Sequence, residues 1–247
     1  MPVRKTRRHG SPVRRAWRAA QADQGSVTGT QGAADVLLAL GRIQQYLGEL
    51  DAATDSQTQA LEIYRAIGHR QGEAYVLTEL GNIWGVVGTE PAKAIDALSQ
   101  ALEIQRAIGH RSGQANALVE LGTVWSLTGE PDRAADALSQ ALDIYRATGD
   151  RNNVAWALNP YAAAIAAAGD LPRAFTLYEQ ALAMNRELNK TDDEGIALEG
   201  LGGCYLARGE VEAAGDPLRA ALEIFRRLGM APDAQRVQER LDGLASG

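Results

Sequence analysis

The sequence is poor in the residues that would support a disulfide framework, a metal cluster or a thick aromatic core. It has one cysteine, Cys204, and three histidines among 247 residues. A single cysteine cannot form an internal disulfide, and it fits a reducing compartment, so we expect a cytoplasmic location. Aromatic residues make up 5% of the chain while alanine is abundant. This composition favours close helix–helix packing, and no run reaches the ~18 apolar residues that would span a bilayer.

Acidic residues are absent from residues 1–18, which hold seven Lys or Arg. The whole chain nevertheless has a formal net charge of −6, so the remainder is strongly acidic. The basic segment lacks the apolar stretch of a signal peptide. Residues 1–33 are rich in Arg, Gly, Ser, Thr and Gln. We therefore expect a basic, largely disordered tail in which residues 14–22 could form a short helix.

A sequence repeat of about forty residues occurs five times after this tail. Its anchors are Ala60-Leu61, Ala101-Leu102, Ala141-Leu142, Ala181-Leu182 and Ala221-Leu222. A second set in step with them is Leu40-Gly41, Leu80-Gly81, Leu121-Gly122, Tyr161-Ala162 and Leu201-Gly202. Self-similarity at such a period is typical of stacked helical repeats. We predict an all-α chain with repeats at about 34–72, 73–113, 114–153, 154–194 and 195–232, and a polar capping helix over 233–244.

Each repeat has the apolar spacing of two helices and its own stop signal. The stop residues are Gly68, Gly109, Gly149, Asn189 and Gly229, which suit the left-handed conformation after a helix. The small residue of the Leu-Gly anchor predicts a close approach of the two helices. The second repeat is one residue longer in its turn, which we expect a loop to absorb. Pro160 and Pro217 lie within predicted helices and predict a kink or a late helix start.

The Leu-Gly anchor followed by an aromatic residue resembles the tetratricopeptide repeat, TPR. Leu80-Gly81 is followed by Trp84, and Leu121-Gly122 by Trp125. The period is similar to the long variety in kinesin light chains, in the adaptor LGN and in bacterial signal-transduction regulators. The resemblance implies a right-handed α-solenoid of five helix pairs over about 34–244.

No motif for chemistry is present. The run Gly200-Leu201-Gly202-Gly203 lies where a helix packs and does not follow a strand, so it does not predict a nucleotide loop. His69 and His110 occupy equivalent turns, where the third repeat has Asp150, which favours helix capping over metal binding. Cys204 is expected to be buried. We therefore expect no catalytic residues, no cofactor and no metal, and a protein that is not an enzyme.

The resemblance implies that the first helices of the pairs line a concave, partner-binding groove. Asparagine there can both donate to and accept from a peptide backbone. The Lys/Arg set that holds a carboxylate in chaperone-binding TPRs is absent, and a stripe of Glu79, Glu120 and Glu199 favours a basic partner. The residues predicted to line the groove are Arg42, Tyr75, Glu79, Asn82, Asn116, Glu120, Thr123, Trp156, Asn159 and Glu199. The alternative is that these are merely solvated helix positions.

We predict a non-catalytic scaffold or adaptor that binds a protein or an extended, basic peptide, with a regulatory role in bacteria. Residues 4–18 of the chain itself are one candidate ligand, in cis or through self-association. The alternative function is a ligand-sensing or DNA-associated transcriptional regulator, or a fragment of one, whose tail contacts nucleic acid. The tail is too short and polar for a folded DNA reader, so we expect weak, non-specific binding at most.

Overall fold

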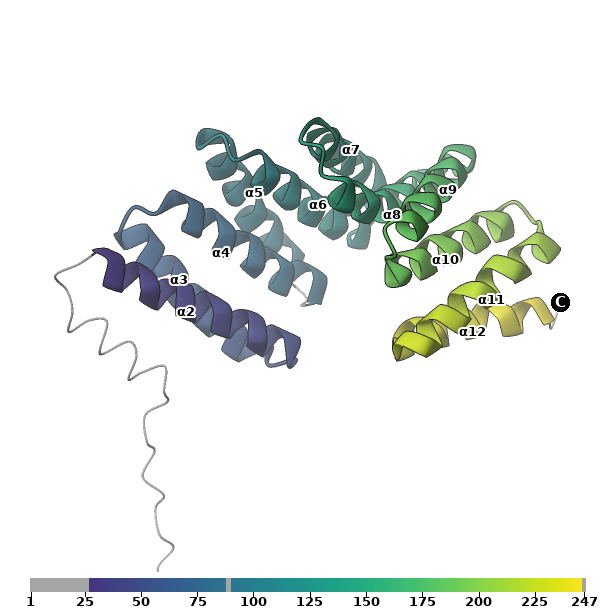
Figure 1. Cartoon of the computed structure of the whole chain (residues 1–247), viewed down its shortest axis with the longest axis horizontal. Helices are drawn as coiled ribbons and strands as arrows, with labels where there is room; N and C mark the ends of the chain where they lie inside the picture. Colours follow the sequence, from purple (N-terminus) through teal and green to yellow (C-terminus); the bar gives the residue numbers. More distant parts are fainter. Residues whose placement is uncertain (1–26, 88–89, 246–247) are drawn as a thin grey trace, which may run out of the picture. The chain divides into compact units, whose positions relative to one another are not determined.

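A computed structural model describes residues 27–87 and 90–245, and over these residues the chain is helical and contains no strand (Figure 1). It divides into two compact units at His110–Arg111. The first unit contains α2 (Val27–Tyr46), α3 (Leu50–Ala66), α4 (Arg70–Asn82) with its π-helical continuation η1 (Ile83–Val87), and α5 (Pro91–Ala107). The second contains α6 (Arg111–Leu127), α7 (Pro131–Ala147), α8 (Arg151–Ala167), α9 (Leu171–Glu187), α10 (Thr191–Ala207), α11 (Val211–Leu228) and α12 (Ala231–Ala245).

The helices pack as successive pairs, which confirms the predicted all-α repeat. The pairs are α2–α3 and α4–α5 in the first unit, and α6–α7, α8–α9 and α10–α11 in the second. Each first helix begins somewhat before its predicted repeat boundary. The boundaries were predicted from the spacing of apolar residues, and the opening turn of each helix is polar. The first pair begins at Val27, so only residues 1–26 of the predicted tail lie outside the described residues.

The predicted stop residues end the second helices as expected. Gly68, Gly109, Gly149 and Gly229 have φ between +68° and +72°, and Asn189 has φ +55°. Asn189 is the only described residue other than glycine with a positive φ. Asparagine is among the few side chains that tolerate this region. The stop signal read from the sequence is therefore a backbone requirement.

The glycines of the Leu-Gly anchor allow the two helices of a pair to touch. A Cβ atom on Gly122 would lie 2.6 Å from Cγ of Leu138 and 3.2 Å from the carbonyl oxygen of Ala134. Gly81 stands in the same relation to Leu98, and Gly202 to Leu218. These three leucines are completely buried. The close approach is confirmed, and the bulky side chain of the second helix fills the space that the glycine leaves.

The two prolines do not end or delay their helices, so a late helix start, one of the two predicted alternatives, is wrong at both positions, and the predicted kink stays a prediction. Pro160 lies inside α8 and Pro217 inside α11. A proline in a helix interior lacks one donor and crowds the carbonyl four residues earlier, which costs about 3 kcal/mol. Packing against both neighbouring helices keeps α8 intact, since Leu158 and Tyr161 on either side of Pro160 are buried.

The longer second repeat does not place its extra residue in a loop alone, contrary to the prediction. Its first helix continues beyond Asn82 as the π-helix Ile83–Val87. The amide of Glu90 bonds to the carbonyl of Trp84, whereas the equivalent amide of Glu130 bonds to Trp125. The link in the second repeat is thus one residue longer, and the wider π turn takes up part of the excess.

The last helix, α12, closes the second unit. Val237 is fully buried with Phe225 and Leu222 of α11, and Leu241 packs against the same cluster. The opposite side of α12 is polar and exposed, with Glu239 and Asp242 among its residues. A terminal element that is apolar inside and polar outside is what a stack of repeats needs to stay soluble.

Candidate functional site

Three predicted groove residues of the first unit meet on the first helices of its two pairs. The Tyr75 hydroxyl donates to the Glu79 carboxylate, and the Arg42 guanidinium acts on both residues. Burial raises the pKa of Glu79 above its ordinary value, while Arg42 and the Tyr75 hydrogen bond oppose the shift. Tyr75 remains 39% exposed. The cluster presents an aromatic ring and a half-buried carboxylate to solvent.

The next position along this face joins the two first helices directly. Nε2 of Gln45 on α2 donates to Oδ1 of Asn82 on α4 over 2.6 Å. Asn82 therefore helps to hold adjacent pairs together. We call the set Arg42, Gln45, Tyr75, Glu79 and Asn82 the α2–α4 face.

The second unit carries the corresponding positions on α6 and α8. Asn116 is exposed and accepts a bond from the buried Tyr145 hydroxyl over 2.6 Å. Burial, followed by the charges of Asp150 and Glu120, raises the pKa of Tyr145. Thr123 donates to the carbonyl of Val119 on its own helix. We call the set Asn116, Glu120, Thr123 and Trp156 the α6–α8 face.

Two predicted groove residues are buried and belong to contacts between helices. Asn159 is 3% exposed and its Nδ2 donates to the backbone carbonyl of Asp193 on α10. Glu199 is 6% exposed. Its oxygens accept two bonds from Arg236 of α12, at 2.8 and 2.7 Å, and pair with Arg240 at 3.4 Å. Neither side chain is available to a partner, so the predicted third glutamate of the acidic stripe is wrong.

The error is one of register. Glu79 and Glu120 immediately precede the leucine of their Leu-Gly anchors, whereas Glu199 stands two residues before Leu201. One residue turns a helical position by about 100°, so Glu199 points toward the next helix. Asn159 stands at the same position relative to Tyr161 and likewise points toward the next helix. Glu79 and Glu120 lie in different units, and their predicted side-by-side placement stays a prediction.

His69 and Cys204 have the structural positions expected for them, whereas His110 contacts a side chain of the preceding helix. Nδ1 of His69 accepts from the amide of Gly72 and caps α4, as Asp150 caps α8. Nδ1 of His110 lies 2.9 Å from Oε1 of Gln105. Cys204 is buried, and this burial raises the pKa of its thiol, which opposes formation of the reactive thiolate.

Trp84 and Trp125, the aromatic residues that follow two of the Leu-Gly anchors, have cationic partners that the sequence pattern did not reveal. Nζ of Lys93 lies 4.1 Å from the centroid of the Trp84 ring, and the guanidinium of Arg133 lies 4.4 Å from that of Trp125. Each cation stands in the first turn of the second helix. Such contacts are worth about 0.5–1 kcal/mol at exposed sites. A Lys or Arg two residues after the turn proline is the signal that would have revealed them.

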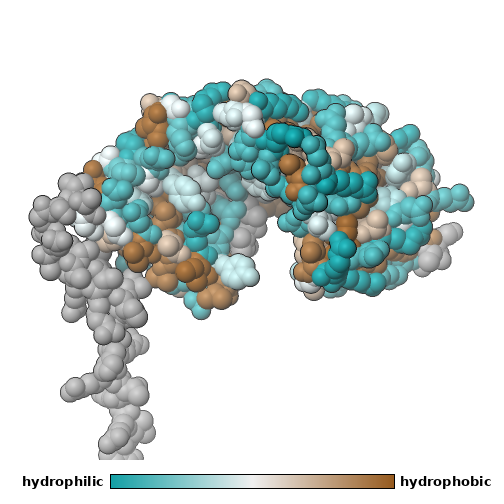
Figure 2. All heavy atoms as spheres, in the orientation of Figure 1, coloured by the Kyte–Doolittle hydropathy of each residue, from teal (hydrophilic) through white to brown (hydrophobic). Residues whose placement is uncertain are grey.

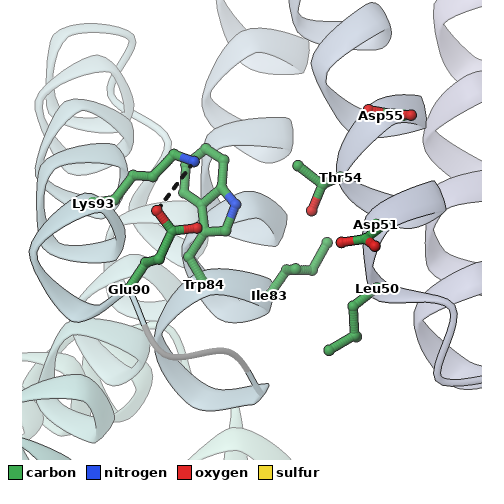
Figure 3. A pocket seen from close by; sticks show the side chains of 8 residues that line it. All are labelled: Leu50, Asp51, Thr54, Asp55, Ile83, Trp84, Glu90 and Lys93. Atoms are coloured by element: carbon green, nitrogen blue, oxygen red, sulfur yellow. Dashed lines mark ion pairs between the residues drawn. The ribbon is translucent and has the colours of Figure 1, made fainter.

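The Trp84–Lys93 contact forms one wall of a pocket of about 390 Å³ in the first unit (Figure 3). Lys93 is paired with Glu90 at 3.5 Å, while Asp51, Thr54 and Asp55 of α3 stand on the other side. The pocket thus has an aromatic side with an occupied cation position and a carboxylate side. It could accommodate a small polar group or a side chain of a partner.

Other classes of site leave no mark on the described part of the chain. Within residues 27–87 and 90–245, no three His, Cys, Asp or Glu side chains come together in a way that could hold a metal ion. None of the helices described has the length and apolar character needed to cross a membrane.

A family model described as tetratricopeptide repeat matches residues 89–147 and 153–227, which together make up more than half of the chain. Curated protein sequences give no match.

Solved structures with the same fold include a putative kinesin light chain from P. anserina, at 18% identity over 81% of this chain and 98% of that one, with a TM-score of 0.66. A Rap protein complexed with Competence and Sporulation Factor has 17% identity over 87% of this chain and 64% of its own, with a TM-score of 0.65. A signal transduction ATPase with a tetratricopeptide repeat sensor from Pyrococcus horikoshii has 15% identity over 94% of this chain and 36% of its own, with a TM-score of 0.72.

Proposed function

The chain belongs to the tetratricopeptide repeat family, a fold of protein-interaction scaffolds, and we propose that its first-helix faces bind an extended basic segment of a regulatory partner protein. The observation that carries the proposal is the half-buried Glu79 carboxylate beside the exposed Tyr75 ring. A titratable group with a perturbed pKa beside an exposed aromatic ring marks a candidate binding position. Glu120 stands at the equivalent position of the next repeat.

The residues around the two glutamates supply the other elements of peptide recognition. Asn116 is exposed and stands four residues, about one helical turn, before Glu120 on α6. Its amide side chain can bond to a peptide carbonyl and a peptide amide at once. Arg42 on the α2–α4 face offers a position for a carboxylate or a carbonyl of a ligand bound beside Glu79. Charge contributes selectivity and association rate more than affinity, because exposed pairs are worth about 0.2–1 kcal/mol each.

A regulatory role in the cytoplasm is the finer part of the proposal. Two proteins of the same fold carry signalling names, the Rap protein with its bound factor and the signal transduction ATPase. At such low identity, these two matches support only the statement that regulators use this fold. The buried, free thiol of Cys204 fits a reducing compartment.

Reversing the charge of both glutamates is expected to weaken peptide binding at least about four-fold, because each reversal replaces an attraction of roughly 0.2–1 kcal/mol with a repulsion of similar size. The variant is Glu79→Lys with Glu120→Lys, and the probe is a fluorescent peptide of alternating Lys and Ser, measured by anisotropy. A peptide with Glu in place of Lys is the specificity control. The Glu62→Lys, Glu223→Lys variant has the same net charge and alters exposed positions of second helices, so it should bind like the unmodified protein.

Equal weakening in both double variants would assign the effect to net charge and remove the first-helix faces from the proposal. A peptide with the sequence of residues 4–18, which lie outside the described residues, tests in the same assay whether the tail itself is a ligand. Strong, sequence-specific binding of duplex DNA in place of the peptide would favour the transcriptional regulator.

Binding of the basic peptide is also expected to weaken as the pH falls through the pKa of Glu79. That pKa is raised in the free protein, so the carboxyl is protonated at a higher pH than an ordinary glutamate. A cationic ligand prefers the ionised form and lowers this pKa, which links binding to release of a proton. The Glu79→Gln variant should bind more weakly at neutral pH and lose this part of the pH dependence. An unchanged pH profile in the variant would show that Glu79 does not face the ligand.

A further inference from the structure

The pocket of about 390 Å³ in the first unit shares no residue with the α2–α4 face. Its walls are the first two turns of α3, the start of η1 and the start of α5. The helices α3 and α5 are the second helices of their pairs, whereas the proposed peptide site uses the first helices. The exposed apolar side chains of this unit lie mainly on α2 (Figure 2), but the pocket lining is mostly polar or charged. The pocket therefore suits a polar ligand that is additional to a peptide on the first-helix faces.

An aromatic ring fills the corresponding position between the last two helix pairs. Counted from the buried alanine near the start of each second helix, Phe175 of α9 takes the place of Thr54 of α3. Counted from the Leu-Gly anchor, Tyr205 of α10 takes the place of Trp84. The rings of Phe175 and Tyr205 meet edge to face, with their centroids 5.2 Å apart. Threonine is smaller than phenylalanine, so the space beside Trp84 is open.

Two carboxylates accompany the open position. Asp51 and Asp55 line the pocket, stand one helical turn apart on α3 and are exposed. The corresponding residues of α9, beside the filled position, are Pro172 and Thr176. The position that lacks the chain's own ring is therefore the one that these two negative charges flank.

The opposite wall of the pocket holds a cation that its neighbour already neutralises. Nζ of Lys93 lies 4.1 Å from the centroid of the Trp84 ring and 3.5 Å from a carboxylate oxygen of Glu90. In Figure 3, the indole nitrogen of Trp84 points across the pocket toward Thr54 and Asp51. With the two aspartates of α3, the lining has three carboxylates against one amine, so its formal charge favours a cationic ligand.

We propose that this pocket binds the side chain of an arginine from a partner protein. The planar guanidinium lies beside the Trp84 ring, and its N–H groups bond to Asp51 and Asp55. A guanidinium is flat, like the ring of Phe175 at the corresponding position, and its fork of donors suits carboxylates. A lysine ammonium has the same charge but no flat surface and is more strongly hydrated, so the pocket selects arginine.

Titration of the full-length protein with Nα-acetyl-arginine amide tests the site, with the indole N–H signal of Trp84 as the readout in nuclear magnetic resonance spectra. The chain has four tryptophans, and loss of one signal in the Trp84→Phe variant identifies it. This signal should shift to saturation at a concentration at least about five-fold lower than with Nα-acetyl-lysine amide. The signal of Trp125, whose indole nitrogen is buried, should stay unchanged. Equal affinity for the two compounds would overturn the assignment to arginine.

Filling the pocket with a side chain of the protein itself gives a sharper comparison. Thr54→Phe adds the ring that Phe175 supplies in the fourth pair, so it should abolish binding of the arginine compound. Gln59→Phe adds the same ring at an exposed position of α3 that does not line the pocket, and binding should be retained. Binding that survives Thr54→Phe would place the ligand elsewhere and overturn the proposal.

Neutralising the carboxylates tests the charge without changing the shape. Asp51→Asn with Asp55→Asn alters two exposed side chains, so the fold should persist while binding of the arginine compound weakens at least about five-fold. Unchanged binding would contradict the proposal. Saturable binding of Nα-acetyl-glutamate α-amide in its place would also do so, because it assigns the pocket to an anion held by Lys93. The Glu79→Lys, Glu120→Lys variant keeps every lining residue and should bind the arginine compound within about two-fold of the unmodified protein, so this proposal and the peptide site can fail separately.

Discussion

Removal of residues 231–247 is expected to unfold the α10–α11 pair and to make the protein aggregate. Loss of α12 exposes the apolar cluster around Phe225, Leu222 and Leu218, since Val237 and Leu241 cover it. Burial of one large apolar side chain is worth about 1.5–3 kcal/mol. The same deletion leaves the Glu199 carboxylate, 9% exposed as a side chain, without Arg236 and Arg240. Because the deletion also uncovers this carboxylate to water, the exposed apolar cluster is the larger cost.

Hydrogen exchange resolved along the chain is the appropriate measurement, because repeat proteins lose their ends before their centre. Amides of α10 and α11 should lose protection, while those of α6 and α7 keep most of theirs. Removal of only residues 246–247 is the control and should change nothing. Full protection of α10 and α11 in the long deletion would show that α12 is not a cap.

The ionic part of the cap can be separated from the apolar part. Arg236→Ala with Arg240→Ala keeps Val237 and Leu241 in place but strips both partners from Glu199. We expect a loss of about 1–3 kcal/mol, the cost of an unsatisfied buried polar group. Adding Glu199→Gln should recover part of that loss, because a neutral amide is less costly to bury than a carboxylate.

Leu138→Ala is expected to destabilise the second unit by about 2–5 kcal/mol, the range for a fully buried leucine. Leu138 is 0% exposed and fills the space over Gly122. Denaturant unfolding, read together with exchange of α6 and α7 amides, measures the loss. Gln140→Ala, an exposed change on the same helix, should stay within about 0.5 kcal/mol of the unmodified protein. A loss below about 1 kcal/mol for Leu138→Ala would contradict the packing described.

Gly122→Ala extends this test to the other side of the contact. On an exposed helix the change would stabilise by about 1 kcal/mol, since alanine is the better helix former. Here the new methyl group would press on Leu138, so we expect a net loss. In the Leu138→Ala background the contact with the leucine side chain disappears and only the 3.2 Å approach to the carbonyl oxygen of Ala134 remains, so the loss caused by Gly122→Ala should become smaller. Additive effects in the two backgrounds would show that the residues do not touch.

Much of the fold was predictable because the signals that define it act locally. Gly68 and Asn189 end helices because of their own backbone preferences, and Gly122 marks a close approach because nothing else fits there. The prolines failed as breakers because tertiary packing outweighs a local penalty of about 3 kcal/mol. The π turn also escaped prediction, since the extra residue can be read from the sequence but its distribution between helix and turn cannot.

The candidate site was less predictable than the fold. The family pattern indicates which helix of each pair faces a partner, but it indicates less clearly which residues of that helix do so. Glu199 matched the expected charge but stood one residue out of register with Glu79 and Glu120. Its partner Arg236 lies on α12, beyond the last full repeat. Charge type alone therefore could not separate a residue that binds a partner from one that holds the stack together.

The π turn at Ile83–Val87 also bears on how this chain can tolerate changes of length. An extra residue in an ordinary α-helix would rotate every later side chain by about 100°. Here the insertion is confined to the end of its helix, and Lys93 still reaches Trp84 as Arg133 reaches Trp125. The end of a first helix is thus a place where the gene can gain a single codon without shifting the periodic pattern of the repeats that follow. An insertion in the middle of α6 would have no helix end nearby to absorb it and would rotate the side chains that follow.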